Sequence, residues 1–193
     1  EDLNKVTKDK ACNMSLVFRN RDGRIDMTCY NRSNDMVWGA YGANVVHLSM
    51  IHEYVAAKVG LPIGTYTQVS NDFHVYTSGK GGEVWDRIRE NNDIDEQIYN
   101  QFKTLVLMNP DQMGMFDHDL LQFFSIYDKF GIKEICECTA WESQYFRELV
   151  IPMLSVLVVH KNYGALTASQ YLKHIVADDW RKACSDWLEV RVK

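Results

Sequence analysis

The sequence predicts an α/β (α+β) fold, with a strand-rich front over residues 1–80 and a mostly helical tail over residues 81–193. Three observations support this prediction. Apolar and polar residues alternate along 24–30, as in a half-buried strand. Residues 45–59 are apolar on nearly every side, as in a helix that lies in a core. From residue 83 onward, apolar residues recur mostly at helical spacing.

The front is expected to begin with a hairpin of two strands, 14–19 and 24–30, separated by the segment "NRDG". Asn and Asp-Gly favour hairpin turns because glycine tolerates a positive φ. In the second strand, Ile25, Met27 and Cys29 alternate with polar residues, so these three side chains are expected to face the core.

A helix and a further strand are expected next. The Gly-rich loop "GAYGAN" precedes the helix 45–59, and Gly60 and Pro62 are expected to end it. Residues 65–76 then alternate again, which predicts another strand.

The tail is expected to be built from helices. Residues 117–130 predict an amphipathic helix, and the aromatic residues Phe123, Phe124 and Tyr127 are expected in its core-facing stripe. Thr167, followed by Gln170, predicts a capping box at the start of a long final helix.

Composition argues against several classes of protein. The 193 residues are 46% hydrophobic and 24% charged, as in an ordinary globular protein. A formal net charge of −5 does not favour nucleic-acid binding. The longest apolar run, "LVIPMLSVLVV", is too short to span a bilayer and contains Pro152. We therefore expect neither a membrane nor nucleic acid as a partner.

The five cysteines lack the spacing of a disulfide framework or a zinc site. We expect reduced thiols, no metal and a cytoplasmic setting. The chain starts with "EDLNKVTKDK", without an initiator methionine, and enters a strand pattern almost at once. We expect it to be the later part of a longer protein.

Five anchors in the front stand at a defined spacing. Cys12 precedes the segment "RSND" by twenty residues. Asn44 ends the Gly-rich loop, and Gly64 leads to the "HVY" segment with His74 and Tyr76. In these anchors, from Cys12 to Tyr76, the chain resembles the thymidylate synthase and deoxynucleotide hydroxymethylase family, and most closely its phage-type branch. The Gly-rich loop is one residue longer than is usual in that family.

The resemblance implies a thymidylate synthase-like mixed sheet with a buried central helix. It also implies a homodimer with shared active sites, and transfer of a one-carbon unit from 5,10-methylenetetrahydrofolate to C5 of a deoxypyrimidine monophosphate. Residues 1–80 are then the later part of a catalytic domain whose N-terminal part precedes Glu1, and residues 81–193 are a helical extension packed on it.

Cys12 is the expected catalytic nucleophile. A thiolate that adds to C6 of a pyrimidine turns C5 into a nucleophilic carbon, but a cysteine of ordinary pKa is mostly protonated at neutral pH. Arg32, on the far strand of the hairpin, is expected to favour the anion. The alternative is that Cys12 is a small buried hydrophobic residue.

The resemblance gives roles to neighbouring residues. Arg32 and Ser33 correspond to phosphate ligands, and a guanidinium fork with a hydroxyl suits a phosphate dianion. Asp35 corresponds to a catalytic residue between the base and the folate ring, and His74 and Tyr76 correspond to ligands of the sugar 3′-hydroxyl. The alternatives are a solvated arginine, a turn aspartate and a polar edge strand.

Asn44 is expected to bind the base and to take part in catalysis. A carboxamide donates and accepts, which complements N3–H and O4 of uracil, whereas cytosine presents the reverse pattern. Family members that use cytosine nucleotides have Asp at this position. Because a mispaired buried edge costs about 1–3 kcal/mol, we favour dUMP over dCMP. Asn44 is alternatively an N-cap residue, and the two roles are compatible.

Two departures from the family pattern favour hydroxymethylation. Asn13 stands where thymidylate synthases usually have a histidine, and the helical tail does not match the segment that closes over the family's site. Water at the exocyclic methylene gives a hydroxymethyl group, and exclusion of water leads to a methyl group. Deoxyuridylate hydroxymethylase is the leading prediction, and thymidylate synthase is the close alternative. Further alternatives are a dCMP hydroxymethylase, a nucleotide-binding protein without turnover and a helical interaction module.

Overall fold

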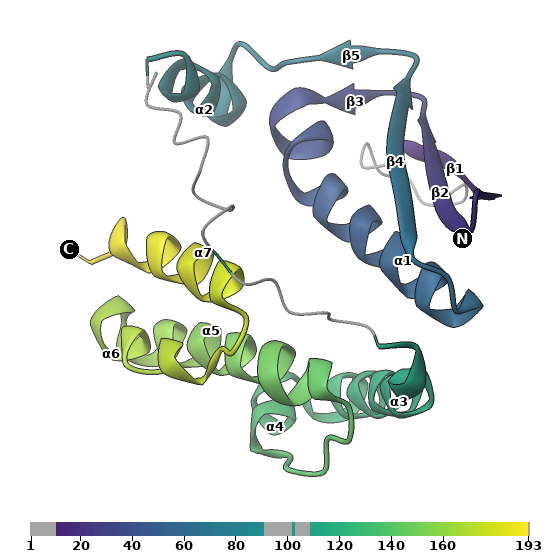
Figure 1. Cartoon of the computed structure of the whole chain (residues 1–193). Coiled ribbons are helices and arrows are strands. Elements are labelled where there is room, and N and C mark those ends of the chain that lie inside the picture. Colours follow the sequence, from purple (N-terminus) through teal and green to yellow (C-terminus); the bar gives the residue numbers. More distant parts are fainter. Residues whose placement is uncertain (1–10, 91–101, 103–108, 193) are drawn as a thin grey trace. The chain divides into compact units, whose positions relative to one another are not determined.

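The computed structural model describes residues 11–90, 102 and 109–192 (Figure 1). The chain divides into two compact units, residues 1–94 and 95–193. Helix α2, Gly79–Glu90, lies in the first unit and spans the position of the boundary predicted after residue 80. The assignment of residues 1–80 and 81–193 to two domains stays a prediction.

The first unit begins with the predicted hairpin of β1, Asn13–Arg21, and β2, Arg24–Asn31. Both residues of the turn have a positive φ, 52° at Asp22 and 78° at Gly23. This conformation matches the twist of the two strands and is the one that Asp-Gly favours. On β2, Ile25, Met27 and Cys29 are buried, which confirms the alternation seen in the sequence.

Strand β4, Ile63–Ser70, pairs in parallel with β2, so the sheet has the order β1-β2-β4 and is mixed. The sheet and its helices confirm the predicted α/β fold class. The single strand predicted over residues 65–76 is wrong in its bounds. It is divided into β4 and a short β5, Phe73–His74, which pairs in parallel with β3, Asn34–Asp35.

This division has a cause in the backbone hydrogen bonds. The N–H of Asn71 donates to the carbonyl of Asn31 at 3.0 Å, and the N–H of Asn34 donates to the carbonyl of Asp72 at 2.8 Å. The segments that follow β2 and β4 therefore leave the first sheet together and pair again as β3 and β5. This second pairing carries two of the predicted site residues, Asp35 and His74.

Helix α1, Ala43–Val59, lies along the sheet beside β4 (Figure 1). Its Leu48 packs with Met27 and Cys29, and three partly buried residues adjoin this cluster, Leu16, Phe18 and Tyr66. The helix buries only the face that meets the sheet, whereas Val46, Ile51 and Val59 on its other side are exposed.

The start of α1 differs from the prediction. The helix begins at Ala43, its N-cap residue is Gly42, and Asn44 lies within the first turn. The interpretation of Asn44 as an N-cap residue is therefore wrong. Gly60, with a φ of 73°, ends the helix as predicted.

The second unit is helical. Its longer elements are α3, Met113–Phe130, α5, Ile151–Tyr163, and α7, Asp178–Glu189, and its shorter ones are α4, Ile132–Glu137, a π-helical turn, Phe146–Val150, and α6, Ala165–Ser169. The amphipathic helix predicted over residues 117–130 is confirmed as part of α3. The core of the second unit includes buried side chains from these elements and their loops, namely Phe116, Ile135, Trp141, Phe146, Leu149, Val156, Ile175 and Leu188.

Two predictions for the tail are wrong. Phe123 lies close to Phe146 of the core, but Phe124 and Tyr127 are exposed. The ring of Tyr127 stacks on that of Phe123 one turn earlier. Thr167 is not an N-cap residue: it lies inside α6, where its hydroxyl donates to the carbonyl of Tyr163. The final helix α7 begins only at Asp178, because the preceding segment is extended and buries Ile175.

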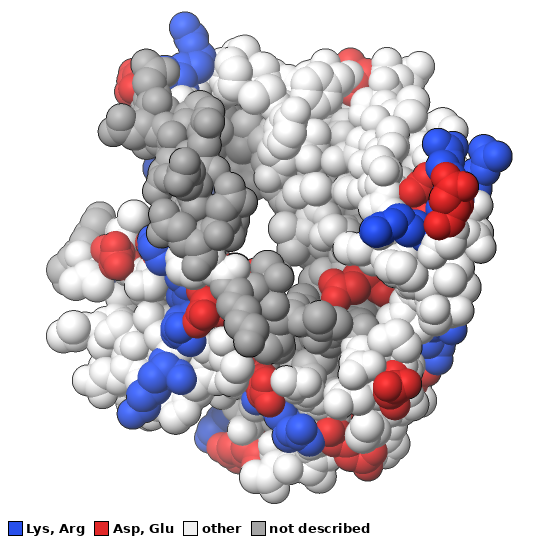
Figure 2. Space-filling model, in the orientation of Figure 1, with Lys and Arg blue, Asp and Glu red and all other residues white. Residues whose placement is uncertain are grey.

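Within the described ranges, no helix is both long and apolar enough to cross a membrane. Figure 2 shows basic and acidic side chains interspersed on the visible face, without a large area of one sign.

Candidate functional site

The open end of the hairpin brings Cys12 and Arg32 together. The N–H of Arg32 donates to the carbonyl oxygen of Cys12 at 3.0 Å, and the guanidinium Nε donates to the carbonyl oxygen of Ala11 at 3.2 Å. Cys12 is half-buried. The spacing of twenty residues thus corresponds to two strands and a turn, which place the thiol-bearing residue beside the arginine.

The pairing of β3 with β5 brings further predicted residues to one place. Asp35 is the register partner of His74, and the hydroxyl of Ser33 lies 3.5 Å from Nδ1 of His74. Nδ1 also lies 3.2 Å from a carboxylate oxygen of Asp72. The segment "RSND" and His74 are therefore neighbours, although about forty residues separate them in the sequence.

Tyr76 reaches the same region in a different way than predicted. The strand β5 ends at His74, so the two side chains do not share a strand face. Their rings instead meet edge to face, with centroids 5.2 Å apart. This contact keeps the phenol next to the imidazole.

One carboxylate oxygen of Asp35 accepts a hydrogen bond, and the other has no partner among the described residues. Oδ2 accepts the N–H of Trp38 at 2.5 Å and thereby caps the π-helical turn Met36–Ala40. Oδ1 is buried and has no partner among the described residues. The indole of Trp38 is 54% exposed beside this carboxylate. A buried acceptor next to an open aromatic ring is suited to a flat ligand that carries N–H donors.

The loop between β3 and α1 brings Gly39 close to the side chains of both Asn34 and Asn44. A Cβ atom at Gly39 would lie 2.4 Å from Oδ1 of Asn34 and 3.4 Å from Nδ2 of Asn44. A Cβ atom at Gly42 would lie 2.3 Å from the carbonyl oxygen of Val37. The two glycines are therefore needed for the close packing of this loop, which sets the position of Asn44.

Several polar residues at this end of the sheet were not predicted as site residues. Asn34, in the third position of "RSND", is buried, and it donates to Gln68 and Ser70 of β4. Asn13 donates to Oδ1 of the buried Asn31 at 2.8 Å. One feature of the sequence could have indicated these residues: asparagines stand at or next to the predicted strands, close to residues that face the core.

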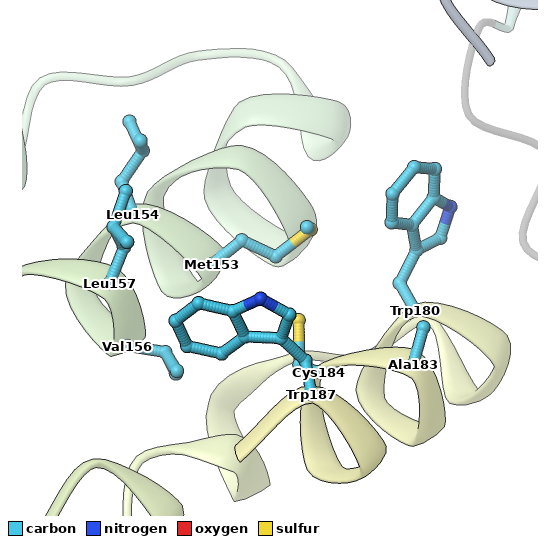
Figure 3. A pocket seen from close by; sticks show the side chains of 8 residues that line it. All are labelled: Met153, Leu154, Val156, Leu157, Trp180, Ala183, Cys184 and Trp187. Carbon is cyan, nitrogen blue, oxygen red and sulfur yellow. The ribbon is translucent and has the colours of Figure 1, made fainter. Parts of the chain in front are cut away.

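The predicted site residues lie in the first unit, and the second unit has an apolar hollow of a different kind. Side chains of α5 and α7 line it, as Figure 3 shows, and its volume is about 340 Å³. Its lining includes Met153, Leu157, Trp180, Cys184 and Trp187. Burial raises the pKa of the Cys184 thiol, which makes this cysteine a weak nucleophile.

Comparison with known proteins is consistent with this geometry. A family model described as thymidylate synthase matches residues 1–128. The chain belongs to the thymidylate synthase family. The match extends beyond Tyr76, where the predicted resemblance ends, and reaches into helix α3 of the second unit.

Relatives in this family include proteins of phages, archaea and a bacterium. A deoxyuridylate hydroxymethyltransferase of Pseudomonas phage M6 is 33% identical over 98% of this chain and 54% of its own length. A deoxyuridylate hydroxymethyltransferase of Bacillus phage SP01 is 36% identical over 68% of this chain and 35% of its own length. A putative thymidylate synthase of Methanosarcina barkeri is 48% identical over 34% of this chain. The phage relatives confirm the predicted phage-type branch, and the chain spans about half of the first relative and about a third of the second.

Proposed function

We propose that the protein transfers a one-carbon unit to C5 of dUMP and forms 5-hydroxymethyl-dUMP. The observation that carries this proposal is the convergence of two pairings. The hairpin brings Cys12 beside Arg32, and the pairing of β3 with β5 brings Ser33 beside His74. The names of the two phage relatives support the same activity.

In the proposed reaction, the Cys12 thiolate adds to C6 of the uracil, and the electron pair of the C5–C6 bond makes C5 nucleophilic. C5 forms a bond to the one-carbon unit and loses its proton, and the bond between that unit and tetrahydrofolate breaks. Water then adds to the one-carbon unit, which gives the hydroxymethyl group, and the thiolate leaves C6, which restores the C5–C6 double bond. Arg32 and Ser33 hold the phosphate of the nucleotide. His74 and Tyr76 bind the sugar 3′-hydroxyl, and Asn44 pairs with the uracil edge.

The residues present fit 5,10-methylenetetrahydrofolate as the cofactor. This cofactor supplies the one-carbon unit. Oδ1 of Asp35 is a buried acceptor without a partner among the described residues, and it suits the N–H groups of a pterin ring. The exposed indole of Trp38 offers a surface for that ring to stack on. Asp35 then lies between cofactor and base, as the resemblance implies.

The side chain of Asn13 supports the hydroxymethyl product over the methyl product. Its Nδ2 donates to Asn31 and also lies 3.4 Å from the sulfur of Cys29, so this amide is used within the sheet. It does not replace the histidine that orders water at the base in thymidylate synthases. Thymidylate synthase remains the second candidate because the relative from Methanosarcina barkeri, 48% identical over 34% of this chain, is named a putative thymidylate synthase.

We further propose that the unit is a homodimer. Helix α1 covers one face of the sheet, and the other face presents Val17, Tyr30 and Val69 as exposed apolar side chains. Thr28, Thr65 and Thr67 line the same face. A second copy of this sheet would bury these β-branched and aromatic side chains, which are costly to leave in water.

The free thiols of Cys29, Cys136, Cys138 and Cys184 fit a reducing compartment, so we propose the host cytoplasm as the location.

Mass analysis of the product formed from dUMP and methylenetetrahydrofolate tests the proposed reaction. We expect a base that has gained a hydroxymethyl group, and a methylated base would favour thymidylate synthase instead. Cys12→Ala should abolish release of the C5 proton, whereas Cys138→Ser, a cysteine change in the second unit, should not. Full release of the proton by Cys12→Ala would overturn the mechanism.

A further inference from the structure

A chain of three hydrogen-bonding groups fixes the orientation of a buried amide beside Asn44. Nε2 of Gln68 donates to the carbonyl oxygen of Ala40 at 3.1 Å. Because a carbonyl only accepts, Gln68 must point its nitrogen toward Ala40. Its Oε1 then faces Asn34, whose Nδ2 donates to it at 2.9 Å. Ser70 provides a second acceptor for the same Nδ2 at 3.1 Å.

This chain determines where the other end of the Asn34 amide points. With Nδ2 fixed on Gln68 and Ser70, Oδ1 must face the opposite way, toward Gly39. Oδ1 is buried and has no partner among the described residues. Only glycine fits at position 39 next to Oδ1, because a Cβ atom there would lie 2.4 Å from it. Nδ2 of Asn44 approaches the same point from the helix side.

The orientation of the Asn44 amide matters for the choice of base. With Oδ1 toward N3–H and Nδ2 toward O4, the amide complements uracil. After a rotation of 180°, the same amide donates to N3 of cytosine and accepts from its N4 amine. Asparagine therefore distinguishes the two bases only if something prevents this rotation.

We propose that Asn34 is a positioning residue that sets this orientation. When a nucleotide is bound, Oδ1 of Asn34 accepts one N–H of the Asn44 Nδ2, and the second N–H of that nitrogen faces O4 of uracil. In the rotated state, two carbonyl oxygens would face each other without a proton between them, which is unfavourable in a buried place. This inference rests on the proposed role of Asn44 in nucleotide binding.

The test is the ratio of the dissociation constants for dUMP and dCMP, measured by competition binding with radiolabelled nucleotide. Asn34→Leu removes the acceptor at similar volume, and Gln68→Leu releases the orientation of Asn34. Each change should reduce the preference for dUMP about tenfold. Gln122→Leu is the matched control: it removes a single side-chain hydrogen bond in α3 of the second unit, from Nε2 of Gln122 to the sulfur of Cys138, so the ratio should stay at the wild-type value.

A folded Asn34→Leu or Gln68→Leu protein with an unchanged ratio would contradict the inference, even if its affinity for both nucleotides fell. The two variants act at different positions, so either one suffices. Wild-type protein that binds dUMP but forms no product would refute the proposed reaction, while the binding ratio would still test the role of Asn34. Wild-type protein that binds neither nucleotide would refute both.

Discussion

The backbone N–H of Arg32 and the carbonyl oxygen of Cys12 form a hydrogen bond of 3.0 Å at the open end of the β1–β2 hairpin. This bond fixes the distance between the two backbone segments that carry the expected nucleophile, Cys12, and the expected phosphate ligand, Arg32. The turn at Asp22 and Gly23 sets the register from Arg21 and Arg24 to Ser15 and Tyr30. A bulge between Asn13 and Ser15 then shifts the pairing by one residue, and this shift places Cys12 opposite Arg32.

Arg32→Ala should weaken nucleotide binding. The guanidinium makes a charge-assisted contact with the phosphate in our proposal, and loss of such a contact typically reduces kcat/KM by about ten- to a hundredfold. Most of the loss should appear as a higher KM for dUMP. Steady-state kinetics measure it, and Arg24→Ala, at the other end of the hairpin, serves as the control. Equal KM values for the two variants would argue against Arg32 as a phosphate ligand.

Asn44→Asp should shift the preference from dUMP toward dCMP. A carboxylate has no N–H to offer O4 of uracil, but it accepts from the N4 amine of cytosine. Competition kinetics with both nucleotides should show the ratio of kcat/KM falling at least about tenfold. If the ratio does not change in a folded variant, Asn44 does not read the base.

Gly39→Ala should impair the site more than the fold as a whole. The added methyl group would lie 2.4 Å from Oδ1 of Asn34, so the loop that carries Asn44 must shift. We expect a loss of about 1–3 kcal/mol in the free energy of unfolding, measured with urea, together with weaker dUMP binding. Gly114→Ala is the control, because nothing lies within 4 Å of its added Cβ in α3. If Gly39→Ala binds dUMP as tightly as the wild type, Gly39 is not needed for the geometry of the site.

Cys184 should react slowly with iodoacetamide near neutral pH. Burial raises its pKa from the ordinary value of 9.0, since the charged thiolate is disfavoured in the apolar hollow between α5 and α7. The fraction of thiolate is therefore smaller at every pH below that pKa, and the alkylation rate should reach half its maximum above pH 9.0. Alkylation rates followed by peptide mass from neutral to alkaline pH measure this. A rate already at its plateau at neutral pH would be inconsistent with the burial of this thiol.

Local patterns were sufficient to predict the elements whose signals lie within a few residues. The turn at Asp22 and Gly23, the buried residues of β2 and the end of α1 at Gly60 all follow from residue type and period. The spacing from Cys12 to Arg32 then follows from the hairpin. The parallel pairing of β4 with β2 depends on contacts between distant segments. The resemblance implied a mixed sheet, but neither it nor the pattern predicted this pairing.

The errors arise where tertiary contacts override local preference. The strand predicted over residues 65–76 is interrupted because Asn71 and Asp72 bond to the backbone beside β3. The final helix starts late because the burial of Ile175 is worth more than continued helix. Asn34 and Gln68 are separated by 34 residues, so their hydrogen bond has no signature in either local sequence.

The most direct test of the central claim is peptide mapping after incubation with 5-fluoro-dUMP and methylenetetrahydrofolate. Fluorine at C5 prevents the loss of a proton from that carbon, so the bond between sulfur and C6 persists. The account predicts one covalent adduct, on the peptide that contains Cys12, and no adduct in Cys12→Ala. An adduct on another cysteine, or turnover of dUMP by Cys12→Ala, would contradict it.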